Sequence, residues 1–349
     1  MTAQVVALLV ASAGTIPFIL REYSLARHES VLGAVRLNLV ASFGVGVLVA
    51  TVSAIAVPKM SLILLLLAAA VTLERVSEAR IGISIADGRV ITPSLAVAIR
   101  AAFLIAFFSL TIGFELLAPL AAYSCGRLVA ACFSTIPLIS VRLPKATHAE
   151  KLRNLIPRLW PFALNNSMIT LRSLDTTLVT AIAGATTGGL YAAASKVLAP
   201  LTIAAGAVAS ALMPRVATMA YGHARRMAMM ILFGAVASSL VTVPVSLLFA
   251  GPMIELVLGE RYLGAAGALT WILISVPAIV AGPLLGTILQ GMRRERYISF
   301  NALFHVPIAL IAVSIAAASG GATAAGATFA ICSVLRVSTL LFALPRPRK

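Results

Sequence analysis

The chain has 349 residues, of which 60% are hydrophobic and 11% are charged, and its formal net charge is +16. Soluble domains are about 45–50% apolar and about 25% charged, so this composition excludes a soluble protein and predicts a chain that crosses a membrane many times. The basic charge is expected to set the orientation of the chain in the membrane, and no nucleic-acid partner is expected.

Apolar segments of about the length of a membrane span follow one another along the whole chain. Each is predicted to be a helix, because lipid requires a backbone whose hydrogen bonds are satisfied within the segment. The eleven segments lie near residues 3–20, 33–57, 60–84, 91–113, 115–141, 159–183, 187–213, 226–250, 263–290, 297–318 and 321–344. The predicted fold class is therefore all-α, a polytopic transmembrane bundle of about 11 helices in two lobes.

Basic residues gather after every second segment. These clusters hold 20 of the 27 basic residues: Arg21/Arg27/Arg36, Arg75/Arg80/Arg89, Arg142/Lys145/Lys151/Arg153/Arg158, Arg215/Arg225/Arg226, Arg293/Arg294/Arg296 and Arg346/Arg348/Lys349. The alternate loops hold only Lys59 and Arg261. Because cytoplasmic loops carry the excess of Lys and Arg, the C-terminus is predicted to lie inside and the N-terminus outside.

The longest basic loop, residues 142–158, carries five cations and one acid, Glu150. It is predicted to be a cytoplasmic linker. Residues 1–141 would form an N-terminal transmembrane lobe of about five helices, and residues 159–349 a C-terminal lobe of six.

Four cations lie inside apolar segments: Arg100, Arg127, Arg172 and Lys196. A cation at the centre of the bilayer costs at least about 2.5–3.5 kcal/mol, so such side chains normally face a bundle interior or a watery cavity. Only Asp175 and Glu115 are expected to offer counter-charge at similar depth. The pattern predicts a basic internal cavity suited to an anionic ligand.

Asn165, Arg172 and Asp175 follow spacings of seven and three, which would place them on one helical face. That face either lines the cavity or makes hydrogen bonds between helices. A short turn at residues 184–189 would make the next segment an antiparallel neighbour. Asp175 and Lys196 would then lie at equal depth and are predicted to approach each other, as a charge pair or as part of a coupling site.

Arg127 has Tyr123 one turn away and no obvious acidic partner, so it is the cation most strongly indicated as a ligand contact. Arg100 is also a candidate ligand contact. It lies nearer the cytoplasmic end, as does Arg336, and either side chain could instead extend to the membrane surface. His305 could take up a proton or serve as a packing residue.

No enzyme signature is found, so no catalytic residue, cofactor or metal site is predicted. Three scattered cysteines, Cys125, Cys132 and Cys332, have no spacing typical of a metal site or a disulfide framework and are interpreted as small core residues.

Three stretches resemble one membrane protein family: Asp175 to Met219, including Gly189-Leu-Tyr191-Ala-Ala-Ala194-Ser-Lys196 and Pro214-Arg215; Gly259-Glu-Arg-Tyr262 with the later Leu289-Gln-Gly291; and Pro17-Phe-Ile-Leu-Arg21-Glu. The chain resembles the polysaccharide flippases of the multidrug/oligosaccharidyl-lipid/polysaccharide (MOP) exporter superfamily. Members have twelve helices in two lobes with both termini inside. The first helix is expected to be absent here, which agrees with an outside N-terminus.

The resemblance implies that the chain moves an undecaprenyl-pyrophosphate-linked oligosaccharide across the bacterial inner membrane by alternating access. Its partners would be this anionic lipid-linked glycan, membrane lipid, and proteins of glycan polymerisation and assembly. Arg127, Arg172 and Lys196, with Arg100 and Asn165, would contact the cargo.

Other functions fit the same pattern. A lipid-linked peptidoglycan-precursor flippase would need a similar cavity, whereas a cation-coupled multidrug exporter would favour an acidic one. From other classes, an inactive or truncated membrane scaffold and a membrane-embedded glycosyltransferase are the alternatives.

Overall fold

The computed structural model describes residues 14–56, 61–89, 91–114, 118–146 and 148–344. These residues are overwhelmingly helical and contain no strand. Three parts of the sequence prediction lie outside the described residues. They are most of the first segment (residues 3–20), Glu115, and the last basic cluster. The all-α prediction is confirmed.

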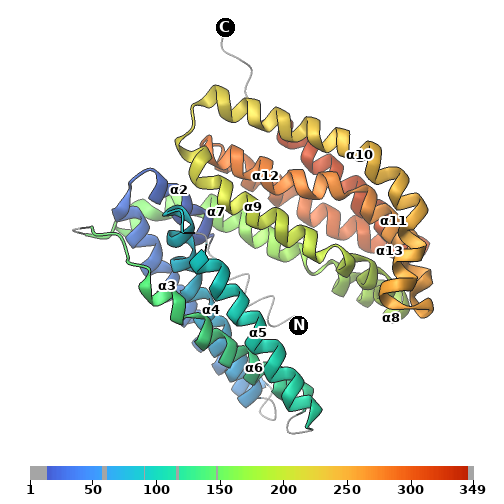
Figure 1. The fold of residues 1–349 in the computed structure, drawn as a ribbon, viewed down its shortest axis with the longest axis horizontal. Coiled ribbons are helices and arrows are strands. Elements are labelled where there is room, and N and C mark those ends of the chain that lie inside the picture. The colour runs from blue at the N-terminus through green and yellow to red at the C-terminus, as the bar shows by residue number, and fades with distance from the viewer. Residues whose placement is uncertain (1–13, 57–60, 90, 115–117, 147, 345–349) are drawn as a thin grey trace. The chain divides into compact units, whose positions relative to one another are not determined.

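The helices fall close to the predicted segments. Their bounds are α2 Thr15–Ser24, α3 His28–Ala56, α4 Ser61–Ala86, α5 Ile91–Gly113, α6 Pro119–Ser134, α7 Leu152–Arg172, α8 Asp175–Val197, α9 Ala199–Thr218, α10 Tyr221–Leu258, α11 Ala266–Ile274, α12 Val276–Gly291 and α13 Glu295–Leu341 (Figure 1). Short 3-10 helices follow α6, at Ile136–Ser140, and precede α11, at Glu260–Ala265.

Two of these helices reverse direction inside their bounds. In α8, Gly184 has φ 87° and ψ 166°, a conformation that only glycine adopts easily. The hydroxyl of Tyr191 nevertheless reaches Asp175 at 3.1 Å, although a straight helix would separate residues 16 apart by about 24 Å. α8 is therefore a hairpin of two arms, residues 175–183 and 185–197, as the short turn in the sequence predicted.

The second reversal divides α13 at Gly320 and Gly321 into arms of residues 295–319 and 322–341. The Tyr297 hydroxyl donates to the carbonyl of Thr339 at 2.6 Å, across 42 residues that would span about 63 Å in a straight helix. The last two predicted segments are these two arms.

Seven helical stretches among the described residues are long and apolar enough to cross a membrane, and the bent pair Glu260–Ile274 and Val276–Gly291 raises this to eight. Two of the seven, Leu152–Val197 and Glu295–Leu341, contain the reversals. The second holds the last two predicted segments, whereas the first holds the segment 159–183 and only the start of 187–213, which continues into α9. α4 falls outside this set because of its charges: Arg75 and Arg80, assigned from the sequence to the following loop, lie within this helix.

The described residues divide into two compact units, one up to Ser167 and one from Met168. In the first, α4 packs against α2, α3 and α6, and α5 packs against α6. In the second, α8 and α11 pack against α13, while α12 packs against α9, α10 and α13. α7 runs through the division. The predicted lobe boundary at residues 142–158 stays a prediction.

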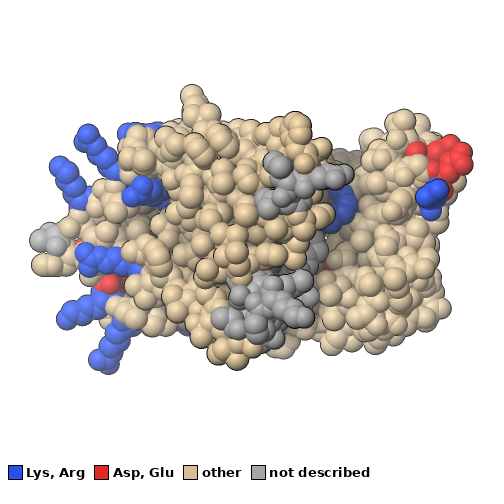
Figure 2. Space-filling model, turned by 90° about the horizontal axis from the view of Figure 1, so that it is seen from below, with Lys and Arg blue, Asp and Glu red and all other residues tan. Residues whose placement is uncertain are grey.

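Large apolar side chains are widely exposed, as lipid contact requires. On α10, Phe233, Leu240 and Leu256 are 77%, 76% and 87% exposed. On the face in Figure 2, most of the surface carries no charged side chain, and Lys and Arg gather in a few places. The chain is thus a multi-pass membrane protein with an outward-facing apolar surface.

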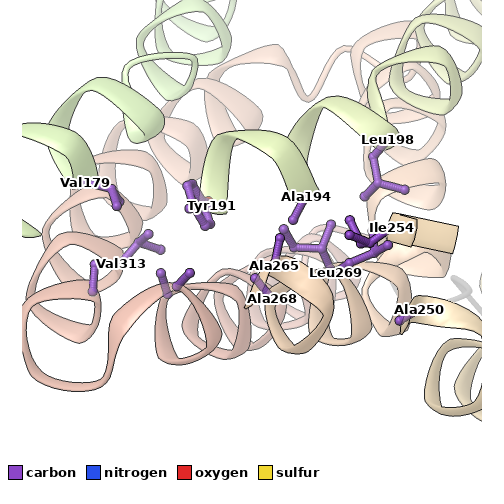
Figure 3. Packing of buried hydrophobic residues seen from close by; sticks show 14 residues of the cluster. Val179, Tyr191, Ala194, Leu198, Ala250, Ile254, Ala265, Ala268, Leu269 and Val313 are labelled. Carbon is purple, nitrogen blue, oxygen red and sulfur yellow. The ribbon is translucent and has the colours of Figure 1, made fainter. Parts of the chain in front are cut away.

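The second unit has its own packed core, in which small residues let helices approach closely. Tyr191 lies fully buried in it between Val179 and Ala194 (Figure 3). A Cβ on Gly326 of α13 would lie 2.8 Å from the carbonyl oxygen of Ala268 on α11, so only glycine permits this contact.

Candidate functional site

The interior charges of the first unit centre on an ion pair between Glu74 of α4 and Arg127 of α6. Arg127 Nε donates to Glu74 Oε1 at 3.0 Å and Nη2 donates to Oε2 at 2.7 Å. Nη1 donates to the hydroxyl of Tyr123 at 3.3 Å. The two charged side chains are only 13% and 9% exposed. The expectation that Arg127 lacks an acidic partner is therefore wrong.

Glu74 falls inside the predicted segment 60–84 but was not singled out, because the acids other than Asp175 were placed at segment ends or in loops. α4 continues to Ala86, so Glu74 lies near the middle of the helix. A carboxylate there needs a counter-charge, and the forked guanidinium of Arg127 supplies it through two parallel hydrogen bonds. Glu74 and Arg127 neutralise each other inside the first unit.

Arg100 of α5 also reaches α4. Its Nη2 donates to Ser77 Oγ at 3.1 Å and its Nε donates to Ser134 Oγ of α6 at 3.4 Å. Ser77 Oγ in turn donates to the carbonyl of Glu74 at 2.7 Å. Arg100 thus points to neighbouring helices rather than only to the membrane surface, and it is held by neutral hydroxyls instead of a carboxylate.

A second buried acid of the first unit, Glu22 at the end of α2, was not singled out in the sequence. It is fully buried and pairs with Arg21, Arg27 and, from α7, Arg158. Arg158 also pairs with Glu150 at 3.1 Å. The signal in the sequence was the basic clustering on either side of Glu22, and the network ties α7 to α2.

In the second unit, Arg172 ends α7 and contacts the second arm of α13. Its Nη2 donates to Ser333 Oγ at 2.9 Å, and its guanidinium carbon lies 4.5 Å from the centroid of the Phe329 ring. Within the described part of the chain, Arg172 forms no ion pair with a carboxylate.

Asp175 is held inside the α8 hairpin. Its carboxylate accepts the hydroxyl of Tyr191 at 3.1 Å and the backbone N–H of Thr176 at 2.6 Å. Lys196 is exposed and forms no direct ion pair with Asp175 among the described residues, although its charge acts on the Asp175 carboxylate. The side chain that donates to Asp175 is Tyr191, and the close approach of Lys196 to Asp175 stays a prediction.

The register of the hairpin explains the difference. The reversal falls at Gly184, earlier than the centre of the turn predicted at 184–189, so residues near 191 face Asp175. Lys196 follows Tyr191 by five residues, which rotates it by about 140° away around the helix.

The expected shared face of Asn165, Arg172 and Asp175 is interrupted. α7 ends at Arg172, and turns at Ser173 and Leu174 separate it from α8. Asn165 and Arg172 keep their seven-residue spacing on one helix, but Asp175 starts another. Asn165 is buried in the first unit, and its side-chain oxygen has no hydrogen-bond partner within the described residues.

His305 lies in the α13 hairpin with both ring nitrogens engaged. Nδ1 is 3.1 Å from the carbonyl oxygen of Asn301, and Nε2 is 3.3 Å from Thr339 Oγ1. This supports the packing interpretation. Among the described residues, no group of three or more His, Cys, Asp or Glu side chains is placed to hold a metal ion.

In comparisons of sequence, no family model and no curated protein matches this chain. Comparison of structures does find similar proteins. The Vibrio cholerae MATE transporter VcmN in its bent form has a TM-score of 0.77 and 14% sequence identity, covering 99% of this chain and 86% of VcmN.

Two further similar structures agree. A MATE transporter in the straight conformation has a TM-score of 0.73 with 16% identity, covering 98% of this chain and 84% of its own. An outward-facing multidrug resistance MATE family transporter of the MOP superfamily has a TM-score of 0.69 with 15% identity over 98% and 84%. This chain therefore has the fold of the MATE transporters, a helical bundle in two lobes.

Proposed function

We propose that the protein is an exporter of the MOP superfamily that works by alternating access, and that its cargo is an undecaprenyl-pyrophosphate-linked oligosaccharide. The fold shared with MATE transporters supports the exporter class. The observation that carries the choice of cargo is Arg172, a cation inside the second unit that contacts Ser333 and Phe329 instead of a carboxylate.

The charge balance of the two units differs. Glu74 neutralises Arg127 in the first unit, so Arg127 alone no longer argues for an anionic cargo. In the second unit, Arg172 and Arg336 lie on membrane helices and form no ion pair among the described residues, and Lys196 is an exposed third cation on α8. Asp175 is the acid at the start of α8, and Glu295 begins α13. A diphosphate headgroup cannot cross hydrocarbon unaided, and unpaired interior cations lower that barrier.

In this proposal Arg172 and Lys196 contact the phosphates or acidic sugars. Arg100 and Asn165 are also proposed to contact the cargo. Arg127 acts with Glu74 as a preformed charge pair whose remaining N–H groups can reach the cargo. Asp175 sets the position of the α8 hairpin through Tyr191. Partner proteins of glycan polymerisation and the inner membrane as the location belong to the same proposal.

The test is a translocation assay with purified protein in liposomes that contain the lipid-linked oligosaccharide in both leaflets. A glycosidase added outside releases the glycan from the outer leaflet only. Vesicles without protein should release about half, whereas an active flippase should carry release towards completion. Arg172→Gln should slow release, and Arg296→Gln, which removes an exposed charge from α13, should not.

A second candidate is cation-coupled multidrug export, favoured by the interior carboxylates of Glu74 and Asp175. The same vesicles separate the two functions by uptake of a cationic dye under a pH gradient. If the vesicles take up the dye while glycan release stays at about half, the protein would be a multidrug exporter and the proposed glycan cargo would be refuted. If correctly inserted protein moves neither the glycan nor the dye, a non-transporting scaffold would be favoured. If it moves a lipid-linked peptidoglycan precursor alone, the protein would be a peptidoglycan-precursor flippase.

A further inference from the structure

Six arginines form an ion pair with a carboxylate within the described residues: Arg21, Arg27, Arg75, Arg89, Arg127 and Arg158. Two arginines on membrane helices of the second unit differ. Arg172 and Arg336 are both partly buried, and neither forms an ion pair with a carboxylate in the described part of the chain.

The structure places these two arginines on one surface. Phe329, Ser333 and Arg336 follow spacings of four and three on the second arm of α13, so they lie on one helical face. Arg172 stacks on Phe329 and donates to Ser333, the first two positions of that face. Its guanidinium therefore lies about one helical turn from the start of the Arg336 side chain, and the two charges are near enough to repel.

Asp175 is the acid whose charge acts on Arg172, but it forms no ion pair with either arginine, and its two oxygens accept the Tyr191 hydroxyl and the Thr176 N–H. Two cations against one acid leave a surplus positive charge in an apolar interior. An anion that bridges the two guanidinium groups would therefore be stabilised. Each guanidinium has five N–H donors, and Arg172 uses one on Ser333.

We propose that Arg172 and Arg336 form a two-arginine site for the diphosphate group of a lipid-linked ligand. This inference rests on the proposed function. It states which part of the cargo, the diphosphate, is bound by the second unit. Phe329 packs against the Arg172 guanidinium, whose carbon lies 4.5 Å from the ring centroid, and this contact limits the freedom of the side chain. Two planar forks suit two adjoining phosphates, because each can donate two parallel hydrogen bonds.

The test is calorimetric binding of inorganic pyrophosphate to the full-length protein in detergent at low salt. Wild-type protein should bind it, and Arg172→Gln or Arg336→Gln should weaken binding about 10–100-fold, the loss expected for hydrogen bonds between charged groups. Arg296→Gln is the matched control on the same helix and should bind as the wild type does. Unchanged binding in both Gln variants would overturn the site.

Two further variants keep the test valid if a Gln variant fails to fold. Arg172→Lys and Arg336→Lys retain the charge but lose the forked geometry, so each should keep part of the affinity. Thermal unfolding without ligand shows that each variant is folded. Lys variants that bind pyrophosphate as tightly as the wild type would contradict recognition by paired guanidinium forks.

The source of the diphosphate is tested with farnesyl diphosphate and with nanodiscs of phosphatidylcholine with or without phosphatidylglycerol. Farnesyl diphosphate binding tighter than pyrophosphate, and lost in the Gln variants, supports a lipid-linked ligand. Binding that depends on phosphatidylglycerol while pyrophosphate does not bind would overturn the diphosphate assignment.

The two proposals fail in different ways. If the Gln variants still release the glycan at the wild-type rate and bind pyrophosphate as before, this site is refuted and the flippase function stands. If pyrophosphate binding depends on both arginines but no glycan moves in liposomes, the flippase function is refuted and the anion site stands.

Discussion

The hydroxyl of Tyr191 donates a hydrogen bond of 3.1 Å to Asp175 from the opposite arm of the same hairpin. Tyr191 is fully buried, and its ring packs in the core of the second unit. The bond therefore connects the carboxylate of Asp175 to a side chain of the apolar core.

Tyr191→Phe should lower the free energy of unfolding by about 1.5–3 kcal/mol, because it removes a buried hydrogen bond to a carboxyl group and leaves the ring packing intact. The measurement is chemical unfolding in detergent. Tyr221→Phe is the control, since Tyr221 is 45% exposed. Lys196→Met should change stability little, and a large loss there would restore Lys196 as the partner of Asp175.

Glu74→Gln should destabilise the first unit by about 3–5 kcal/mol, because it leaves the guanidinium of Arg127 buried without its counter-charge. The double change Glu74→Gln with Arg127→Met should recover much of that loss. Unfolding of the single and double variants measures both effects, with the exposed Glu29→Gln as control. A double variant less stable than Glu74→Gln alone would argue against the ion pair.

Reporter fusions after Arg153 and after Thr186 should report opposite sides of the membrane, with Arg153 in the cytoplasm. Arg153 belongs to the longest basic cluster in the sequence and lies at the start of α7, and Thr186 follows the reversal of α8 at Gly184. Fusions that report one side would refute the predicted topology, including the cytoplasmic C-terminus.

Tyr23 at the end of α2 should titrate above the ordinary value. Burial, and then its hydrogen bond to Asp87, raise the pKa of the Tyr23 phenol above 10.0. A raised pKa means that the fold favours the neutral phenol, so this contribution is complete below pH 10 and is lost as the pH rises through the folded pKa. The difference in phenolate absorbance between wild type and Tyr23→Phe measures the titration, which Asp87→Asn should move back towards 10.

The helical architecture could be predicted because lipid leaves the backbone few choices, and the hydrophobic segments record that constraint directly. Glycines at 184 and 320–321 marked the two reversals. The partners of interior charges were harder to predict. Glu74 and Arg127 are 53 residues apart, and nothing local in the sequence links them.

The register of the hairpins was the other limit. A turn predicted a few residues late was enough to exchange Tyr191 for Lys196 as the partner of Asp175. A helix rotates by about 100° per residue, so small errors in a turn redirect every side chain beyond it. The break after Arg172 has the same effect on the expected face of Asn165, Arg172 and Asp175.

The pairing of Glu74 with Arg127 also constrains the order in which the protein is made. Glu74 is synthesised 53 residues before Arg127, which at about 5–20 residues per second is about 3–10 s earlier. During that interval Arg127 is not yet available to the carboxyl group of α4, so α4 is poorly suited to partition alone into lipid. Stable insertion of α4 and α6 therefore depends on their being held together until the second helix has emerged.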